Sequence, residues 1–172
     1  KNIRFHAGVS FDPQRTKMQY TRPSQLDTLI TRSVFNVSPT LRFRYRMSKT
    51  NSIDIRYRGT AGQPSMTNLL DVVDNSDPLN ISMGNPGLKP SWTNSLRASY
   101  YGYNPARQAG IMAHLAFAHT TNSISTRVIY NDATGVRYSR PENINGSWDL
   151  DGTFIYNFSF GKNKQFSLST NT

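Results

Sequence analysis

The chain contains 172 residues, enough for one domain with a core of ordinary size. Hydrophobic residues make up 36%, below the roughly 45–50% typical of globular domains, and the mean hydropathy is −0.58, although aromatic residues still reach 12%. This combination favours two-sided β-structure, and the lack of an apolar run near 18 residues excludes helical membrane spans. The net charge of +10 favours binding of polyanions but does not distinguish nucleic acid, lipopolysaccharide and an acidic solute. The chain has no cysteine, which excludes disulfides and thiol chemistry.

Alternation of apolar and polar side chains is the main structural signal, because successive side chains of a strand point to opposite faces. Between Leu41 and Met47, leucine, phenylalanine, tyrosine and methionine alternate with three arginines. After a polar turn at 48–52, isoleucine and tyrosine alternate with aspartate and arginine over 53–58. These two segments predict a hairpin with one apolar face and one charged face.

The same alternation returns in the second half of the chain. It covers 96–100 and, after a turn at 104–107, continues until its parity slips at 120–123, which predicts a β-bulge within one long strand. The turn residues at 131–135 predict a hairpin, and alternation resumes over 148–160. In all, seven spanning segments are predicted, near 1–11, 34–47, 52–59, 92–103, 109–130, 136–160 and 165–172.

The connections between these segments are unequal in length. Turns at 48–52, 104–107 and 161–164 are short, whereas the connections at 12–33 and 59–91 are long. Transmembrane β-barrels have short turns on one side of the membrane and long loops on the other. The sequence therefore predicts an all-β, antiparallel up-and-down meander that is a fragment of a large transmembrane β-barrel. The odd number of segments agrees with an internal part of such a barrel, because bacterial barrels have even strand counts.

Two short helices are predicted inside the long connections. Helix-like spacing places one after Ser65, through Leu69, Leu70 and Val73. The other is predicted near Leu26, Leu29 and Ile30.

Four motifs resemble the outer-membrane barrel of TonB-dependent receptors, in the branch called the outer membrane protein β-barrel family. They are Asn-Val-Ser-Pro-Thr-Leu at 36–41, Gln-Pro-Ser-Met-Thr-Asn-Leu at 63–69, Asp-Asn-Ser-Asp-Pro-Leu at 74–79, and Gly-Asn-Pro-Gly-Leu-Lys-Pro at 84–90. The flanking strands fit as well, so the resemblance covers essentially the whole chain. Ser91 departs from the pattern, because many relatives place glutamate after Lys-Pro.

The resemblance implies a 22-stranded barrel around an N-terminal plug, which imports a bulky nutrient with energy relayed by the TonB protein. Residues 1–172 are then a single segment of the barrel domain, with the plug and remaining strands outside it, in the outer membrane of a bacterial cell. Expected partners are outer-membrane lipid, the protein's own plug and TonB, with a surface lipoprotein as a further candidate. Nucleic acid is not expected, and a fragment with unpaired sheet edges is expected to self-associate.

Five arginines are the candidate ligand-binding residues, because they alternate with lipid-compatible residues and would project into the polar lumen of a barrel. They could attract an anionic ligand or acidic groups of the plug. Asp149 and Asp151, on one strand face, are expected to form salt bridges to lumen arginines. Aromatic girdles are expected at Trp92, Tyr100, Trp148 and Tyr156. The five arginines are Arg42, Arg44, Arg46, Arg56 and Arg58.

No enzymatic function, metal or cofactor is expected. The sequence has no Gly-rich phosphate loop, Gly-x-Ser-x-Gly elbow or His-Glu-x-x-His, and His114 and His119 would lie on opposite faces of a strand. Asp71, Asp74 and Asp77 do not match the EF-hand spacing and suit turns. Two alternatives remain: a soluble, secreted β-sandwich that binds carbohydrate or another surface ligand, and, less favoured, a basic nucleic-acid binder.

Overall fold

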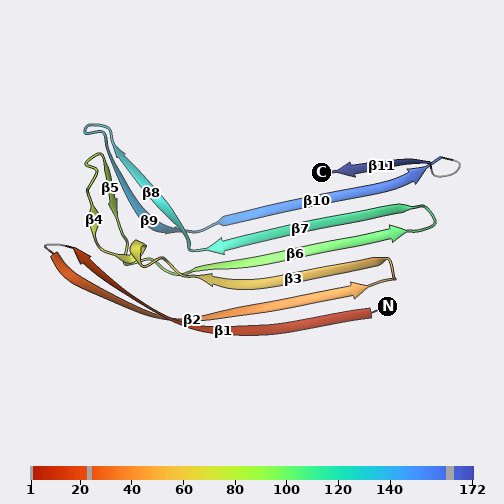
Figure 1. The fold of residues 1–172 in the computed structure, drawn as a ribbon, viewed down its shortest axis with the longest axis horizontal. Coiled ribbons are helices and arrows are strands. Elements are labelled where there is room, and N and C mark those ends of the chain that lie inside the picture. Colours follow the sequence, from red (N-terminus) through yellow and green to blue (C-terminus); the bar gives the residue numbers. More distant parts are fainter. Residues whose placement is uncertain (1, 23–24, 162–164) are drawn as a thin grey trace.

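The fold is dominated by a seven-stranded antiparallel sheet with the strand order β1-β2-β3-β6-β7-β10-β11 (Figure 1). The computed structural model describes residues 2–22, 25–161 and 165–172. Within this main sheet, neighbours in space are also neighbours in the order of the chain, as expected of a meander. Its strands are β1 (Asn2–Arg22), β2 (Gln25–Arg46), β3 (Asn51–Gly62), β6 (Ser91–Asn104), β7 (Ala109–Thr121), β10 (Ser147–Phe160) and β11 (Phe166–Asn171).

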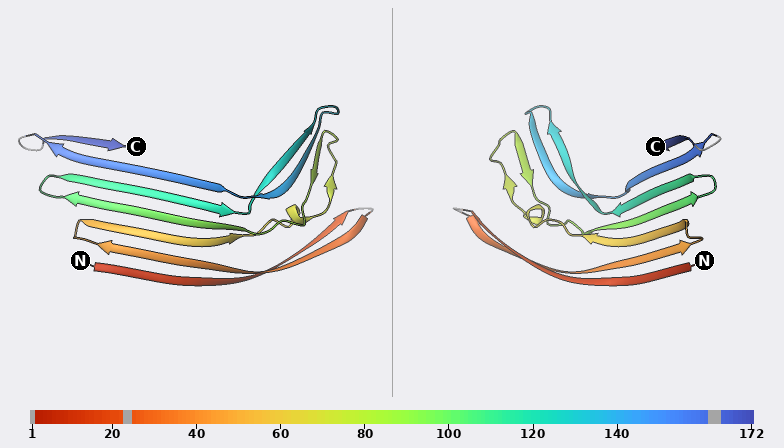
Figure 2. Two further views of the ribbon diagram at one scale, coloured as in Figure 1. Left: turned by 180° about the vertical axis from the view of Figure 1, so that it is seen from behind. Right: turned by 45° about the vertical axis from the view of Figure 1, so that its right-hand side comes forward.

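A second sheet, which we call the distal sheet, stands at one end of the main sheet (Figure 2). Its strand order is β4-β5-β9-β8, and its β5–β9 pair is parallel. The last residues of β1 and the first residues of β2 lie at the same end, whereas the short β2–β3 and β6–β7 turns lie at the opposite end (Figure 1). The strands of the distal sheet are β4 (Val73–Asp74), β5 (Asn80–Met83), β8 (Ser123–Asn131) and β9 (Val136–Ile144).

The seven predicted segments correspond to the seven strands of the main sheet, with three differences in detail. The first connection is not a loop, because β1 and β2 remain paired as far as Arg22 and Gln25. A helix near Leu26, Leu29 and Ile30 is therefore wrong, since these residues belong to β2. The predicted bulge is a strand break at Asn122, whose φ of 52° lets β7 end in the main sheet and β8 begin in the distal one. A second break, between Ile144 and Ser147, separates β9 from β10.

The register between strands gives the main sheet one apolar and one polar face. Leu41, Phe43 and Tyr45 lie opposite Tyr57, Ile55 and Ile53. The apolar row continues across β6, β7 and β10 through side chains such as Leu96, Phe117 and Leu150. Residues of opposite parity, among them the arginines, occupy the other face, as alternation predicts.

The apolar face of the main sheet is uncovered. Phe5 is 65% exposed and Leu150 56% exposed, and the distal sheet extends beyond the end of the face instead of packing over it. A β-sandwich would hide such side chains against a second sheet, so the sandwich alternative is wrong. In the part of the chain that the structure describes, no helix has the length and apolar character needed to cross a membrane.

A small buried core lies where the two sheets meet, and all of its residues except Leu70 belong to the four motifs. The predicted helical turn after Ser65 forms as a 3-10 helix, η1 (Thr67–Leu69), but it ends at Leu69, and Val73 belongs to β4 instead of the helix. Around it, Leu69, Leu70 and Leu88 are buried, as is Asn36, whose Oδ1 accepts a hydrogen bond of 2.8 Å from Gln63 Nε2. Gly84 is required by the close approach of the Leu70 carbonyl oxygen, because a Cβ atom at position 84 would overlap it.

Candidate functional site

The five predicted arginines lie on the polar face of β2 and β3. In the register, Arg42 faces Arg56, Arg44 faces Asp54, and Arg58 faces Thr40. Arg46 lies at the last position of β2, opposite Ser52. The structure therefore brings all five to one face, which we call the cationic face.

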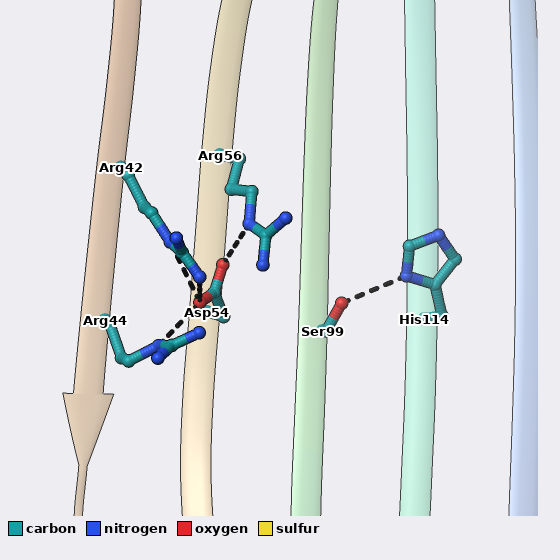
Figure 3. A network of polar contacts seen from close by, with 6 residues as sticks. All are labelled: Arg42, Arg44, Asp54, Arg56, Ser99 and His114. Carbon is teal, nitrogen blue, oxygen red and sulfur yellow. Dashed lines mark hydrogen bonds and ion pairs between the residues drawn. The ribbon is translucent and has the colours of Figure 1, made fainter.

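Asp54 is the centre of the cationic face (Figure 3). Its Oδ2 accepts hydrogen bonds from Arg42 Nη2 at 2.8 Å and from Arg44 Nε at 2.7 Å, while its Oδ1 accepts one from Arg56 Nε at 2.6 Å. The Asp54 side chain is only 15% exposed, whereas its three partners are 37–56% exposed. The arginines thus shield the carboxylate from solvent. Because charge-assisted hydrogen bonds are stronger than neutral ones, these contacts also fix the C-terminal part of β2 against the N-terminal part of β3.

One carboxylate does not neutralise this cluster. Three guanidiniums against Asp54 leave two net positive charges, and Arg97 extends the cationic face onto β6, directly opposite Arg56. Like charges that face each other across strands are destabilising. An anion placed over Arg56 and Arg97 would relieve that repulsion.

A groove of about 470 Å³ lies beside the Asp54 cluster. Among the described residues, the structure shows no carboxylate paired with Arg58 or Arg97. Their guanidiniums remain available to a ligand or to another part of the protein. The groove is lined by Arg56, Tyr57, Arg58, Thr60, Ser95 and Arg97.

Asp54 and Arg97 were not among the predicted site residues. The available signal for Asp54 was that it is the one acidic residue within an arginine-rich alternating hairpin, but its role depends on the β2–β3 register. Asp149 and Asp151 form no salt bridge within the described parts of the chain, so their pairing with lumen arginines stays a prediction. Asp151 faces Ala116 of β7, and β7 separates it from Arg97.

The four aromatic residues predicted to form girdles all lie on the apolar face, at two levels. Trp92 and Trp148 lie toward the distal sheet, and Tyr100 and Tyr156 toward the short turns. Asn94 Oδ1 accepts hydrogen bonds from Trp92 Nε1 at 3.0 Å and from the Tyr57 hydroxyl at 2.8 Å. At a rise of about 3.3 Å per residue, Trp148 and Tyr156 are about 26 Å apart along β10. A strand tilt of about 40° reduces this to about 20 Å of height, slightly less than an apolar band about 25 Å tall. Their girdle role stays a prediction.

Potential metal ligands do not gather in the described residues, where no group of three His, Asp or Glu side chains could hold an ion. His114 hydrogen-bonds Ser99 at 3.0 Å on the polar face, whereas His119 lies on the other face (Figure 3). Asp77 closes a turn: hydrogen bonds from the Asn80 side chain and the Leu79 amide hold its pKa below the usual value.

Comparison with known proteins agrees with the two-faced sheet. The model of the "Outer membrane protein beta-barrel family" matches residues 1–172. A solved structure of a double mutant of the Serratia marcescens hemophore receptor HasR, in complex with its hemophore HasA and heme, superimposes with a TM-score of 0.59 at 16% identity. That similarity covers 91% of this chain and 29% of HasR, so the chain spans less than a third of the receptor. No curated protein matches the chain.

In a barrel of this family, an apolar face meets lipid and a polar face meets the interior, as the two faces of the main sheet require. The chain belongs to the outer membrane protein beta-barrel family and is a segment of barrel wall in the bacterial outer membrane.

Proposed function

We propose that this segment is part of a TonB-dependent receptor that imports a bulky, anionic nutrient, and that the cationic face lines its lumen. The observation that carries the proposal is the groove at Arg58 and Arg97, next to guanidiniums that already share a single carboxylate. Positive charges that line a cleft with low-dielectric walls raise the local concentration of anions and speed the binding of anions to the cleft. The segment itself is inferred to have no catalytic role.

The whole protein is inferred to contain further strands and a plug. Among the described strands, β1 and β11 end the main sheet and have no partner on their outer sides. A closed barrel leaves no such edge, so further strands of the same protein would pair there. Acidic groups of the plug are a second class of partner for the cationic face, and TonB would supply the energy for import. The distal sheet would then lie outside the cell, because long extensions are extracellular in these barrels.

The test compares uptake and binding of bulky nutrients by cells that produce the whole protein. The panel contains heme, which the HasR structure contains, a ferric siderophore with free carboxylates, and a neutral oligosaccharide. The double variant Arg58→Gln/Arg97→Gln is expected to weaken binding of the anionic nutrient at least tenfold, because hydrogen bonds to charged groups contribute about 1.5–3 kcal/mol each. Depletion of TonB is expected to abolish uptake and leave binding unchanged.

The matched control is Lys49→Gln/Arg107→Gln, which removes two positive charges from the short turns at the other end of the main sheet. It is expected to bind and import like the unmodified protein. Import of the neutral oligosaccharide alone, with no effect of the Arg58/Arg97 variant, would contradict an anionic nutrient. Uptake that persists without TonB would contradict TonB-dependent import.

A further inference from the structure

Two strand breaks lie beside each other where the main sheet meets the distal sheet. One is Asn122, between β7 and β8, and the other is the pair Asn145 and Gly146, between β9 and β10. They are neighbours in space, because β7 pairs with β10 on one side of them and β8 pairs with β9 on the other. Both connections between the β8–β9 hairpin and the main sheet therefore pass through one place.

Side-chain amides hold both ends of the Asn122 backbone at this place. The Asn122 N–H donates a hydrogen bond of 2.9 Å to Asn145 Oδ1. The Asn122 carbonyl accepts one of 2.9 Å from Asn143 Nδ2. With a φ of 52°, Asn122 has a backbone conformation that residues other than glycine seldom adopt. The two hydrogen bonds thus stabilise the backbone at the point where β7 ends and β8 begins.

Asn145 and Gly146 form the only Asn-Gly pair in the sequence. Asparagine loses ammonia most readily before glycine, because glycine has no Cβ atom to hinder attack by its backbone nitrogen on the asparagine side chain. Gly146 has a φ of 84°, and the space where a Cβ atom would stand is open. Both residues are exposed and lie outside the strands, so strand pairing does not hold the chain there.

The hydrogen bonds at this pair leave the reacting nitrogens accessible. Among the described residues, none is formed by the Gly146 N–H, which contains the attacking nitrogen, or by Asn145 Nδ2, the nitrogen that leaves. During the attack, negative charge develops on Asn145 Oδ1, to which the Asn122 N–H already donates. A donor placed at a developing oxyanion lowers the barrier to reaction.

We propose that Asn145 is a site of spontaneous deamidation, and that its isoaspartate product loosens the attachment of the distal sheet. The Gly146 backbone nitrogen forms a bond to Asn145 Cγ, the bond from Cγ to Nδ2 breaks, and the Gly146 proton leaves with the amine as ammonia. The product is a cyclic succinimide. Water then opens the ring at one of its two carbonyls and gives aspartate or isoaspartate. The reaction is independent of what the receptor imports.

The two products have different effects on the junction. Aspartate at position 145 keeps an acceptor oxygen for the Asn122 N–H and adds only a negative charge. In isoaspartate the backbone runs through the former side chain, so the chain is one carbon atom longer and the free carboxylate is attached to Cα. The Asn122 N–H then loses its acceptor, and the break between β7 and β8 loses one of its two restraints.

The first experiment ages the whole protein in lipid vesicles in mildly alkaline buffer. Peptide mapping by mass spectrometry measures deamidation at each asparagine, and labelling with isoaspartyl methyltransferase measures isoaspartate. Asn145 is expected to be the fastest of all asparagines to react. The variant Asn145→Gln keeps the side-chain amide but must close a larger ring, so deamidation at this position is expected to be slower by about tenfold, because the longer side chain orients the reacting atoms less well.

The second measurement is hydrogen exchange of the same samples. Aged protein that contains isoaspartate at position 145 is expected to exchange faster in β8 and β9 and unchanged in β3 and β6. Fresh Asn145→Asp, which represents the aspartate product alone, is the matched control and is expected to exchange like the fresh unmodified protein.

Asp151 and Gly152 provide an internal comparison, because an Asp-Gly pair can form the same succinimide. They pair with Ala116 and Leu115 of β7, so the sheet holds their backbone and isoaspartate is not expected there. Equal isoaspartate at Asp151 and Asn145 would overturn the proposal, as would an Asn145 that stays intact or reacts no faster than glutamine at the same position. Isoaspartate at position 145 without faster exchange in β8 and β9 would contradict the loosening of the distal sheet.

Discussion

Asp54 illustrates how one residue sets the character of a charged surface. Its carboxylate binds Arg42, Arg44 and Arg56 within 2.8 Å and is largely covered by them. Without it, three guanidiniums on adjacent strands would face one another in a partly dehydrated surface, where repulsion between like charges is strong. The residue therefore both stabilises the sheet and limits the positive charge that the cationic face presents.

Asp54→Asn is expected to destabilise the folded barrel by about 1.5–3 kcal/mol, the contribution of hydrogen bonds to charged groups. The measurement is urea-induced unfolding of the whole protein in vesicles. Asp151→Asn is the matched control, because Asp151 is exposed on the same face and forms no ion pair among the described residues. An equal loss of stability in both variants would show that the Asp54 cluster contributes nothing specific.

At the scale of elements, the junction between the two sheets is built from side-chain amides. Asn143 Nδ2 donates to the Lys89 carbonyl and to the Asn122 carbonyl, both at 2.9 Å, and Asn143 Oδ1 accepts from the Lys89 amide at 2.8 Å. Asn85 adds a bond of 2.9 Å from its Nδ2 to the Pro141 carbonyl. These contacts attach the 84–90 motif to β9 and to the break between β7 and β8, so they set how the distal sheet meets the main sheet.

Asn143→Ala is expected to loosen the distal sheet while the main sheet stays folded. Loss of its three hydrogen bonds would cost about 1–3 kcal/mol, the penalty for leaving polar groups without partners. Hydrogen exchange should speed up in β8, β9 and the 63–90 connection and stay unchanged in β3 and β6. Asn157→Ala, on an exposed position of β10, is the control, and faster exchange throughout both sheets would contradict a local role for Asn143.

Local patterns predicted the strands of the main sheet well, because alternation is a property of each strand alone. They did not predict pairing between distant segments. Leu26, Leu29 and Ile30 are spaced as in a helix, yet all three belong to β2, where Leu29 and Ile30 pair with Gln19 and Met18 of β1. The parallel β5–β9 pair joins Asn80 to Arg137, and no feature of either segment alone indicates the other. In the candidate site, alternation predicted the common face of the arginines, whereas the Asp54 contacts needed the strand register.

At the scale of the whole molecule, the two faces of the main sheet suit different environments: the apolar face suits lipid and the polar face suits the barrel interior. Leu115, half exposed, lies at the centre of the apolar face, and Ala116, the next residue, lies on the polar face. The two faces can therefore be tested with the same new side chain at adjacent positions.

Leu115→Arg is expected to destabilise the barrel in lipid vesicles by about 2–4 kcal/mol, because it places a charge at mid-depth on the lipid side. Ala116→Arg, on the polar face, is expected to change stability by less than about 1 kcal/mol. Unfolding free energies measured in the same vesicles decide the comparison. If Ala116→Arg is the more damaging variant, the faces have been assigned in the wrong sense.

The parallel β5–β9 pair also has a consequence for the order of folding. β5 pairs with a strand that begins more than fifty residues later, whereas β3 pairs with its chain neighbour β2 across a short turn. Contacts between distant residues form slowly, because loop closure costs entropy before the contact is gained. The β5–β9 pair is therefore expected to form later than the β2–β3 hairpin, so the distal sheet would be completed after the hairpins of the main sheet.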